Sequence, residues 1–92
     1  MVILYSEEFV QRLEYILDFI SKDSKSRSDA FLNDLRSKIK NIPFMPYGFR
    51  KNNQLNQENV RDLIFKGYVI PFEISDGCIE ILSIYKSNLW KP

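Results

Sequence analysis

The sequence has no histidine and a single cysteine, Cys78. Zinc sites built from cysteine and histidine ligands are therefore excluded, as are nucleophilic sites of the Ser-His-Asp and Cys-His kinds. The three glycines, Gly48, Gly67 and Gly77, are isolated, so a Gly-rich phosphate-binding loop is excluded as well. We expect neither a metal nor a cofactor. The chain is either a binding module or an enzyme that works with Lys, Arg, Tyr, Asp or Glu.

Length and composition indicate a small folded protein. The chain has 92 residues, 45% of them hydrophobic, and a net charge of +1, which excludes disorder. We expect one domain over residues 1–92. No apolar run approaches the roughly 20 residues of a membrane-spanning helix, and the opening Met-Val-Ile-Leu-Tyr-Ser lacks the basic region and cleavage site of a signal peptide. Without a second cysteine for a disulfide, we expect a reducing, cytoplasmic location.

Charge is distributed unevenly along the chain. Residues 1–21 carry a net charge of −3, residues 22–51 a net charge of +5 and residues 52–92 a net charge of −1. The basic middle segment is either a surface for nucleic acid or an acidic partner, or simply the solvated face of a helix. Its last two cations, Arg50 and Lys51, follow a Pro-Tyr-Gly turn, a setting in which loop residues are often functional.

The first half of the chain predicts one strand and two helices. Residues 2–5 are β-branched and aromatic, which suits a short strand. Ser6 is a good helix N-cap, and an apolar stripe then predicts an amphipathic helix over residues 7–21. A second stripe, capped by one of the serines at 24, 26 and 28, predicts a helix that ends before Pro43. The short connection favours an antiparallel helical hairpin.

The second half predicts three antiparallel strands, over residues 60–65, 68–74 and 78–85. Lys66-Gly67 and Asp76-Gly77 join them, and Asp-Gly is the stronger signal for a type I′ hairpin. Pro71 conflicts with the second strand, because proline cannot donate to a ladder and belongs on an edge strand or at a bulge. The predicted fold is an α+β domain in which the N-terminal strand and these three strands form one sheet, with the helical hairpin on one face.

Several segments together resemble a known family over nearly the whole chain. Residues 5–9, Tyr-Ser-Glu-Glu-Phe, lead from a strand into a helix, and residues 43–50 form a turn that contains proline and Gly-Phe-Arg. Residues 59–63 and 67–70 are similar to an arginine strand and a Gly-Tyr hairpin, and residues 79–84 to a final isoleucine-rich strand. In this order and spacing they resemble the RelE/ParE superfamily of toxins from bacterial type II toxin–antitoxin systems, and the ParE-like branch more closely.

The resemblance implies a growth-inhibiting toxin, associated with plasmid stabilisation, that is neutralised by a cognate antitoxin. RelE-like members are ribosome-dependent mRNA endonucleases, and ParE-like members poison DNA gyrase. RelE-like nucleases carry an arginine after the hairpin Gly-Tyr, where this chain has Val69, and an arginine-rich stretch after the last strand, where residues 85–90 hold one lysine and no arginine. Loss of these phosphate-clamping guanidiniums favours binding and inhibition of a target such as gyrase over RNA cleavage on the ribosome. A non-toxic interaction module of the same fold is the other alternative.

Two sets of residues are candidates for the functional site. The candidates for a nuclease are Arg61, Lys66, Tyr85 and Lys86, and those for target binding are Arg50, Lys51, Arg61 and Trp90. A structural alternative stands beside each of them, such as an ion pair of Arg61 with Asp62 or Glu58. We expect the three cations of the second set to converge on one side of the sheet, and Lys66 to lie about 17 Å from them.

The predicted sheet also indicates where an antitoxin binds. Helices on one face leave the other face and an edge of the sheet uncovered. We expect a disordered acidic and apolar segment of the antitoxin to fold over this surface. The basic stretch over residues 22–51 attracts such a segment and speeds its association.

Overall fold

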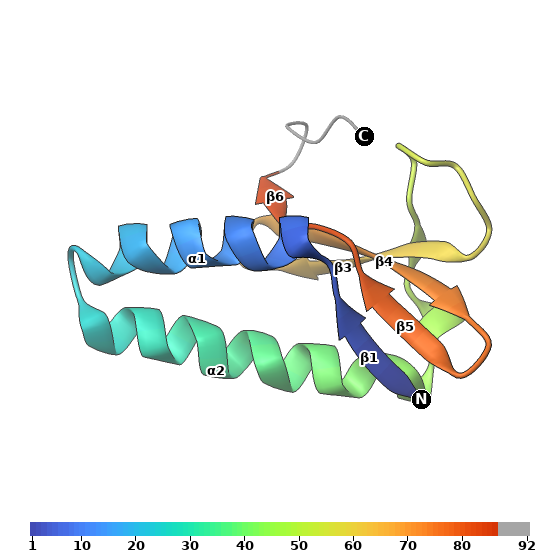
Figure 1. Ribbon diagram of the computed structural model, residues 1–92, viewed down its shortest axis with the longest axis horizontal. Coiled ribbons are helices and arrows are strands. Elements are labelled where there is room, and N and C mark those ends of the chain that lie inside the picture. Colours follow the sequence, from blue (N-terminus) through green and yellow to red (C-terminus); the bar gives the residue numbers. More distant parts are fainter. Residues whose placement is uncertain (87–92) are drawn as a thin grey trace.

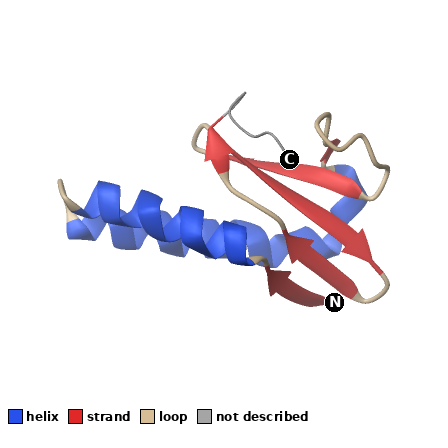
Figure 2. Ribbon diagram, turned by 45° about the horizontal axis from the view of Figure 1, so that its top comes forward, coloured by secondary structure: helices blue, strands red, loops and turns tan. Residues whose placement is uncertain are grey.

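The computed structural model describes residues 1–86 as a helical hairpin packed against a mixed β-sheet (Figure 1). The helices are α1 (Glu7–Ser21) and α2 (Lys25–Asn41), followed by two short 3-10 helices, η1 (Ile42–Phe44) and η2 (Pro46–Gly48). The strands are β1 (Val2–Tyr5), β2 (Arg50–Lys51), β3 (Val60–Phe65), β4 (Tyr68–Ser75), β5 (Cys78–Ile81) and β6 (Tyr85–Lys86). The turn between the two helices projects beyond the sheet (Figure 2). The predicted α+β fold is confirmed.

Serine side chains fix both ends of the helical hairpin. The Ser6 hydroxyl accepts from the amide three residues on at 3.0 Å and caps α1. Among the three candidate serines, Ser24 is the cap of α2, and it accepts from the amide three residues on at 3.1 Å. The hydroxyl of Ser28 instead donates to the Leu17 carbonyl at 2.9 Å, which ties α2 to α1.

The core lies between the helices and the sheet, and the predicted apolar stripes form its helical side. Strands β3, β4 and β5 contribute alternate residues to this face, as the period of two requires. The buried cluster contains Phe9, Phe31, Leu35, Ile39, Ile42, Leu63, Phe65, Ile70, Phe72, Ile74, Ile79, Ile81 and Ile84. The face of the sheet that carries these side chains is called the helix face below, and the opposite one the outer face.

The sheet differs from the predicted one in two places. Its order is β1-β5-β4-β3-β2, with β6 paired to β4, and β1 runs parallel to β5 while the other pairs are antiparallel. Strand β2 was not predicted, because two polar residues carry no strand signal of their own. The last predicted strand, residues 78–85, is divided into β5 and β6.

Pro71 explains this division. It lies in β4, an inner strand with β3 on one side and the β5–β6 segment on the other, so it is not on an edge strand. Between the pairs Phe72–Ile81 and Val69–Tyr85, two residues of β4 face three residues of the β5–β6 segment, so Pro71 lies opposite a one-residue bulge. The Leu82 amide donates to the Pro71 carbonyl at 2.9 Å, but Pro71 has no N–H to donate to the Leu82 carbonyl. The Ser6 hydroxyl donates to the Leu82 carbonyl instead, at 2.6 Å. The ladder between β4 and β5 therefore ends beside Pro71, and pairing resumes at β6.

The sequence favoured Asp76-Gly77 over Lys66-Gly67 as a type I′ turn, and the structure shows the reverse. In Lys66-Gly67 both residues have positive φ, 48° and 84°, as a type I′ turn requires. In Asp76-Gly77 only the glycine does, at 69°, so the Asp-Gly turn is not of type I′. The flanking strands impose the strained φ on Lys66, a tertiary constraint that overrides the local preference for Asn or Asp.

Alanine substitutions at Ser24 and Ser6 distinguish the loss of a helix cap from the loss of the hydrogen bond that Ser6 donates to the Leu82 carbonyl. Ser24→Ala should lower the free energy of unfolding by about 1 kcal/mol, the usual cost of a lost cap. Ser6→Ala should cost about 2–3 kcal/mol, because the Leu82 carbonyl also loses its hydroxyl donor. Urea unfolding of both variants measures the difference, and equal losses would contradict this account of Pro71.

Candidate functional site

The cations predicted to form a target-binding site lie on two faces of the sheet. Strand β2 pairs with β3 so that Arg50 lies opposite Asp62 and Lys51 opposite Arg61. Since successive side chains of a strand point to opposite faces, Lys51 and Arg61 share the helix face and Arg50 lies on the outer face. The expected convergence of all three on one side is therefore wrong. Trp90, the fourth candidate, lies outside the described residues.

Arg61 is built into the fold. Its Nε donates to the Glu58 carbonyl at 3.0 Å, and its Nη1 donates to the carbonyls of Tyr47 and Phe49 at 3.2 and 3.0 Å. Its Nη2 pairs with the Glu58 carboxylate, and the guanidinium stacks 5.1 Å from the centre of the Tyr47 ring. Only 12% of the side chain is exposed. These contacts fasten the two loops that flank β2 to β3, which favours the structural alternative, with Glu58 as the acidic partner.

A polar network lies on the outer face around Asp62. The buried carboxylate accepts from Arg50 Nε at 3.1 Å and from Asn52 Nδ2 at 2.7 Å. Asn52 is fully buried, and its amide oxygen accepts from the backbone of Leu55 at 2.8 Å. These groups and Tyr85 line a pocket of about 160 Å³. Asn52 was missed from the sequence, because nothing in the Asn- and Gln-rich stretch distinguishes it from its exposed neighbours.

Tyr85 closes this network from β6. Burial is the main cause that raises the pKa of its phenol above 10.0, and the negative charge of Asp62 adds to it. A hydrogen bond with Asn52 and the charge of Arg50 act in the opposite direction. The phenol is therefore neutral at physiological pH, and its side chain is buried as the structural alternative expected.

The remaining nuclease candidates lie at the hairpin between β3 and β4. Lys66 Nζ pairs with Asp34 at 3.3 Å and lies 5.4 Å from the centre of the Phe65 ring. Lys86 Nζ lies 5.3 Å from the centre of the Tyr68 ring. Both lysines thus rest on aromatic rings of the helix face, where a cation is attracted to the π-system.

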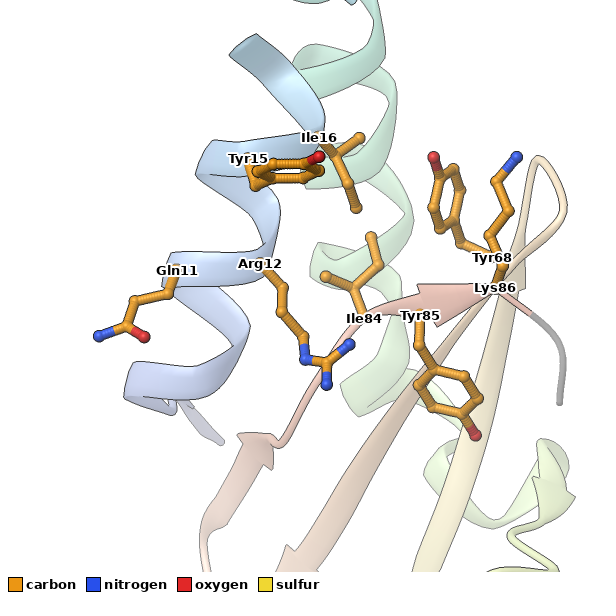
Figure 3. Close-up of a pocket in the computed structure, with 8 residues that line it drawn as sticks. All are labelled: Gln11, Arg12, Tyr15, Ile16, Tyr68, Ile84, Tyr85 and Lys86. Atoms are coloured by element: carbon orange, nitrogen blue, oxygen red, sulfur yellow. The ribbon is translucent and has the colours of Figure 1, made fainter. Parts of the chain in front are cut away.

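A groove of about 390 Å³ runs between α1 and this end of the sheet (Figure 3). Arg12 and Ile16 enter it from α1, and Tyr68 and Lys86 border it on the sheet side. The hydroxyl of Tyr85 points away from these side chains (Figure 3), in keeping with its place on the outer face opposite Val69. The groove therefore joins Lys86 to Arg12 and Tyr15, and Tyr85 lines it with its hydroxyl turned away from them.

Within residues 1–86 the four nuclease candidates do not meet in one site. Arg61 stands at the start of β3 and Lys66 directly after its end, about 17 Å along the strand. Tyr85 faces outward, and Lys86 lies on the helix face opposite Tyr68. This part of the chain also contains no group of three or more Asp, Glu, Cys or His side chains suited to a metal ion. Neither of its helices is long and apolar enough to cross a membrane.

Arg61 and Lys51 form a matched pair for testing the structural role of the guanidinium. Arg61→Ala should lower the free energy of unfolding by about 2–4 kcal/mol, because several carbonyls lose a charged donor. Lys51→Ala, directly across the ladder, should change it by no more than about 0.5 kcal/mol, since its pairing with Glu58 is long and exposed. Denaturant unfolding measures both, and equal effects would refute the bracing role of Arg61.

The raised pKa of Tyr85 predicts a loss of stability at alkaline pH. The phenol keeps its proton to higher pH in the folded chain than in the unfolded chain. Its contribution is therefore complete below about pH 10 and is lost as the pH rises through the folded-state pKa. We expect unfolding curves of the wild type and Tyr85→Phe to diverge above pH 10, with the wild type losing stability faster. Parallel pH profiles would contradict the shift.

Comparisons with known proteins agree with the architecture. Residues 3–88 match the family described as the ParE toxin of the type II toxin–antitoxin system, parDE. The fold is similar to that of a solved structure described as a chromosomal ParDE TA system from P. aeruginosa, with a TM-score of 0.75 and 17% sequence identity over 94% of this chain and 95% of that chain. No curated protein sequence matches the chain. Since the family match spans nearly the whole sequence, the chain belongs to the ParE toxin family of type II toxin–antitoxin systems.

Proposed function

We propose that this ParE-family toxin inhibits growth by binding a macromolecular target, DNA gyrase, rather than by cutting RNA. One observation carries the proposal: the groups that RNA cleavage would require are far apart and already engaged in the fold. Cleavage needs a base for the 2′-hydroxyl, an acid for the leaving oxygen and positive charge on the phosphate, all within reach of one another.

Within residues 1–86 three of the four candidate groups are engaged in other contacts, and the fourth, Lys86, rests on the ring of Tyr68. The guanidinium of Arg61 is surrounded by its own loop carbonyls. Lys66 is paired with Asp34, and the phenol of Tyr85 is neutral and turned to the outer face. A protein that acts by surface complementarity needs no such constellation, so the arrangement favours binding.

The outer-face pocket supports a second candidate, an mRNA endonuclease. It brings a guanidinium, a carboxylate and a phenol together in Arg50, Asp62 and Tyr85. The charges of Arg50 and Asp62 offset each other at 3.1 Å, however, and Asp62 is buried. The pocket therefore offers little net positive charge for a transition-state phosphate, and gyrase inhibition is the better supported function.

Neutralisation by an antitoxin is part of the proposal. Strand β1 ends the sheet order, so one side of its backbone has no partner strand within the described residues. Its outer-face side chains, Val2 and Leu4, are exposed. An extended apolar segment gains main-chain hydrogen bonds and apolar contacts along such an edge. Acidic residues in that segment complement the positive charge of residues 22–51.

Expression of the chain alone in bacteria tests the function. Induction should arrest growth and cause cleaved DNA to accumulate with an SOS response, while primer extension finds cellular mRNA uncut. Co-expression of the protein encoded by the neighbouring gene should restore growth. Codon-phased cuts within translated messages would overturn the proposal in favour of the endonuclease, and unaffected growth with soluble protein would favour a non-toxic module.

Tyr85→Phe serves as the matched control for mechanism. It removes only the phenolic oxygen from a buried side chain, so the fold should survive. A toxin that acts by binding should keep its growth inhibition in this variant. If Tyr85→Phe abolished toxicity in a folded protein, the phenol would have a chemical role and cleavage would be the better explanation.

A further inference from the structure

Three large apolar side chains stand exposed in the turn that follows α2. Phe44 is 81% exposed, Met45 71% and Tyr47 53%; Phe44 ends η1, Tyr47 lies in η2, and Met45 joins the two. Single exposed apolar residues are common, whereas a contiguous group of them marks an interaction surface. These three residues are called the apolar loop below.

The apolar loop is held rigidly from three directions. Ile42 before it is fully buried, and Phe49 after it packs edge-on against Phe72 with ring centres 5.4 Å apart. Between these anchors, Arg61 binds the carbonyl and the ring of Tyr47. The backbone of the loop is therefore held in place, so binding to a partner does not carry the cost of ordering that backbone.

The apolar loop lies in a stretch of the sequence that carries only positive charges. Between Asp34 and Glu58 the chain has five cations and no acidic residue. Arg50 and Lys51 have acidic partners, but Arg36, Lys38 and Lys40 form no ion pair with another residue of the described chain. The negative end of the α2 dipole is equivalent to roughly half a charge, so it cannot neutralise these three positive charges.

We propose that the apolar loop is the surface with which the toxin contacts its protein target, a folded partner that offers an apolar pocket rimmed by carboxylates. This inference rests on the proposed function and names the contact that it requires. A second copy of the chain is a poor occupant, because two basic surfaces repel each other. A disordered antitoxin segment gains more from a groove or a strand edge than from rigid protruding side chains.

The proposal gives Arg61, the apolar loop and the lysines of α2 different roles. Arg61 acts as a positioning residue, which holds Tyr47 and so orients the loop, and it makes no contact with the target. The exposed aromatic and methionine side chains supply the contact itself, as residue types enriched at interface centres do. The lysines at the end of α2 accelerate association with the acidic rim.

Phe44→Ala and Phe19→Ala form the matched pair for the test. Phe19, 66% exposed, lies near the end of α1, at the other end of the helical hairpin from the apolar loop (Figure 1). Both variants should keep thermal midpoints within a few degrees of the wild type, as surface changes do. Affinity for purified DNA gyrase should fall by about tenfold or more in Phe44→Ala and by less than about twofold in Phe19→Ala.

Charge reversals on α2 provide a second, independent test of the inference. Lys40→Glu, beside the loop, should slow association with gyrase several-fold at low salt, and the difference should shrink as salt is added. Lys25→Glu, at the opposite end of the same helix, should have a much smaller effect. Equal effects of the two reversals would show that the chain's overall charge, and not this surface, steers binding.

The outcomes separate this inference from the function on which it rests. If the wild type binds gyrase and Phe44→Ala binds equally well, the apolar loop is not the contact, and the proposed function stands. If Phe44→Ala keeps its gyrase affinity but loses the antitoxin, the loop belongs to the antitoxin and the inference is wrong. If the wild type neither binds gyrase nor causes DNA cleavage, the proposed function fails and the inference fails with it.

Discussion

A proline in the middle of the sheet sets the course of the second half of the chain. The Pro71 carbonyl accepts a hydrogen bond from the Leu82 amide, but Pro71 has no N–H to donate to the Leu82 carbonyl. The Ser6 hydroxyl donates to that carbonyl instead. The same hydroxyl caps α1, and the Ser6 amide donates to the carbonyl of Ile81. One residue, Ser6, thus joins α1 to the end of β5 and to the segment that follows it. The ladder to β4 resumes only at Tyr85, which places that phenol on the outer face.

Two adjacent residues of β3 then organise the two faces of the sheet. Arg61 points to the helix face and holds the loops on either side of β2, whereas Asp62 points to the outer face and binds Arg50 and Asn52. Strand alternation separates an arginine with a bracing role from an arginine paired with a buried carboxylate. This separation is the reason that Arg50 and Arg61 do not form one anion-binding site.

Local features made much of the fold predictable from the sequence. Both helices, the capping role of Ser6 and the three main strands followed from periodicity, capping chemistry and turn residues. Strand β2 and the buried state of Asn52 were not predictable, because Asp62, ten residues further along, determines both through its bonds. The candidate site was the least predictable part of the molecule. Sequence patterns supplied its cations, but the strand register, which decides the face on which each lies, emerges only from the assembled sheet.

The apolar loop cannot be explained as incomplete burial. The chain around it alternates between residues that enter the core and residues that leave it: Ile42 and Phe49 are anchored, and Phe44 and Met45 between them are turned to solvent. Two prolines fix the φ angles of these turns, and Arg61 satisfies carbonyls that a mobile loop would leave to water. This bracing stabilises the fold, and it also holds the backbone of the loop in one conformation. A loop held in this way presents Phe44 and Met45 to a partner without the cost of ordering its backbone.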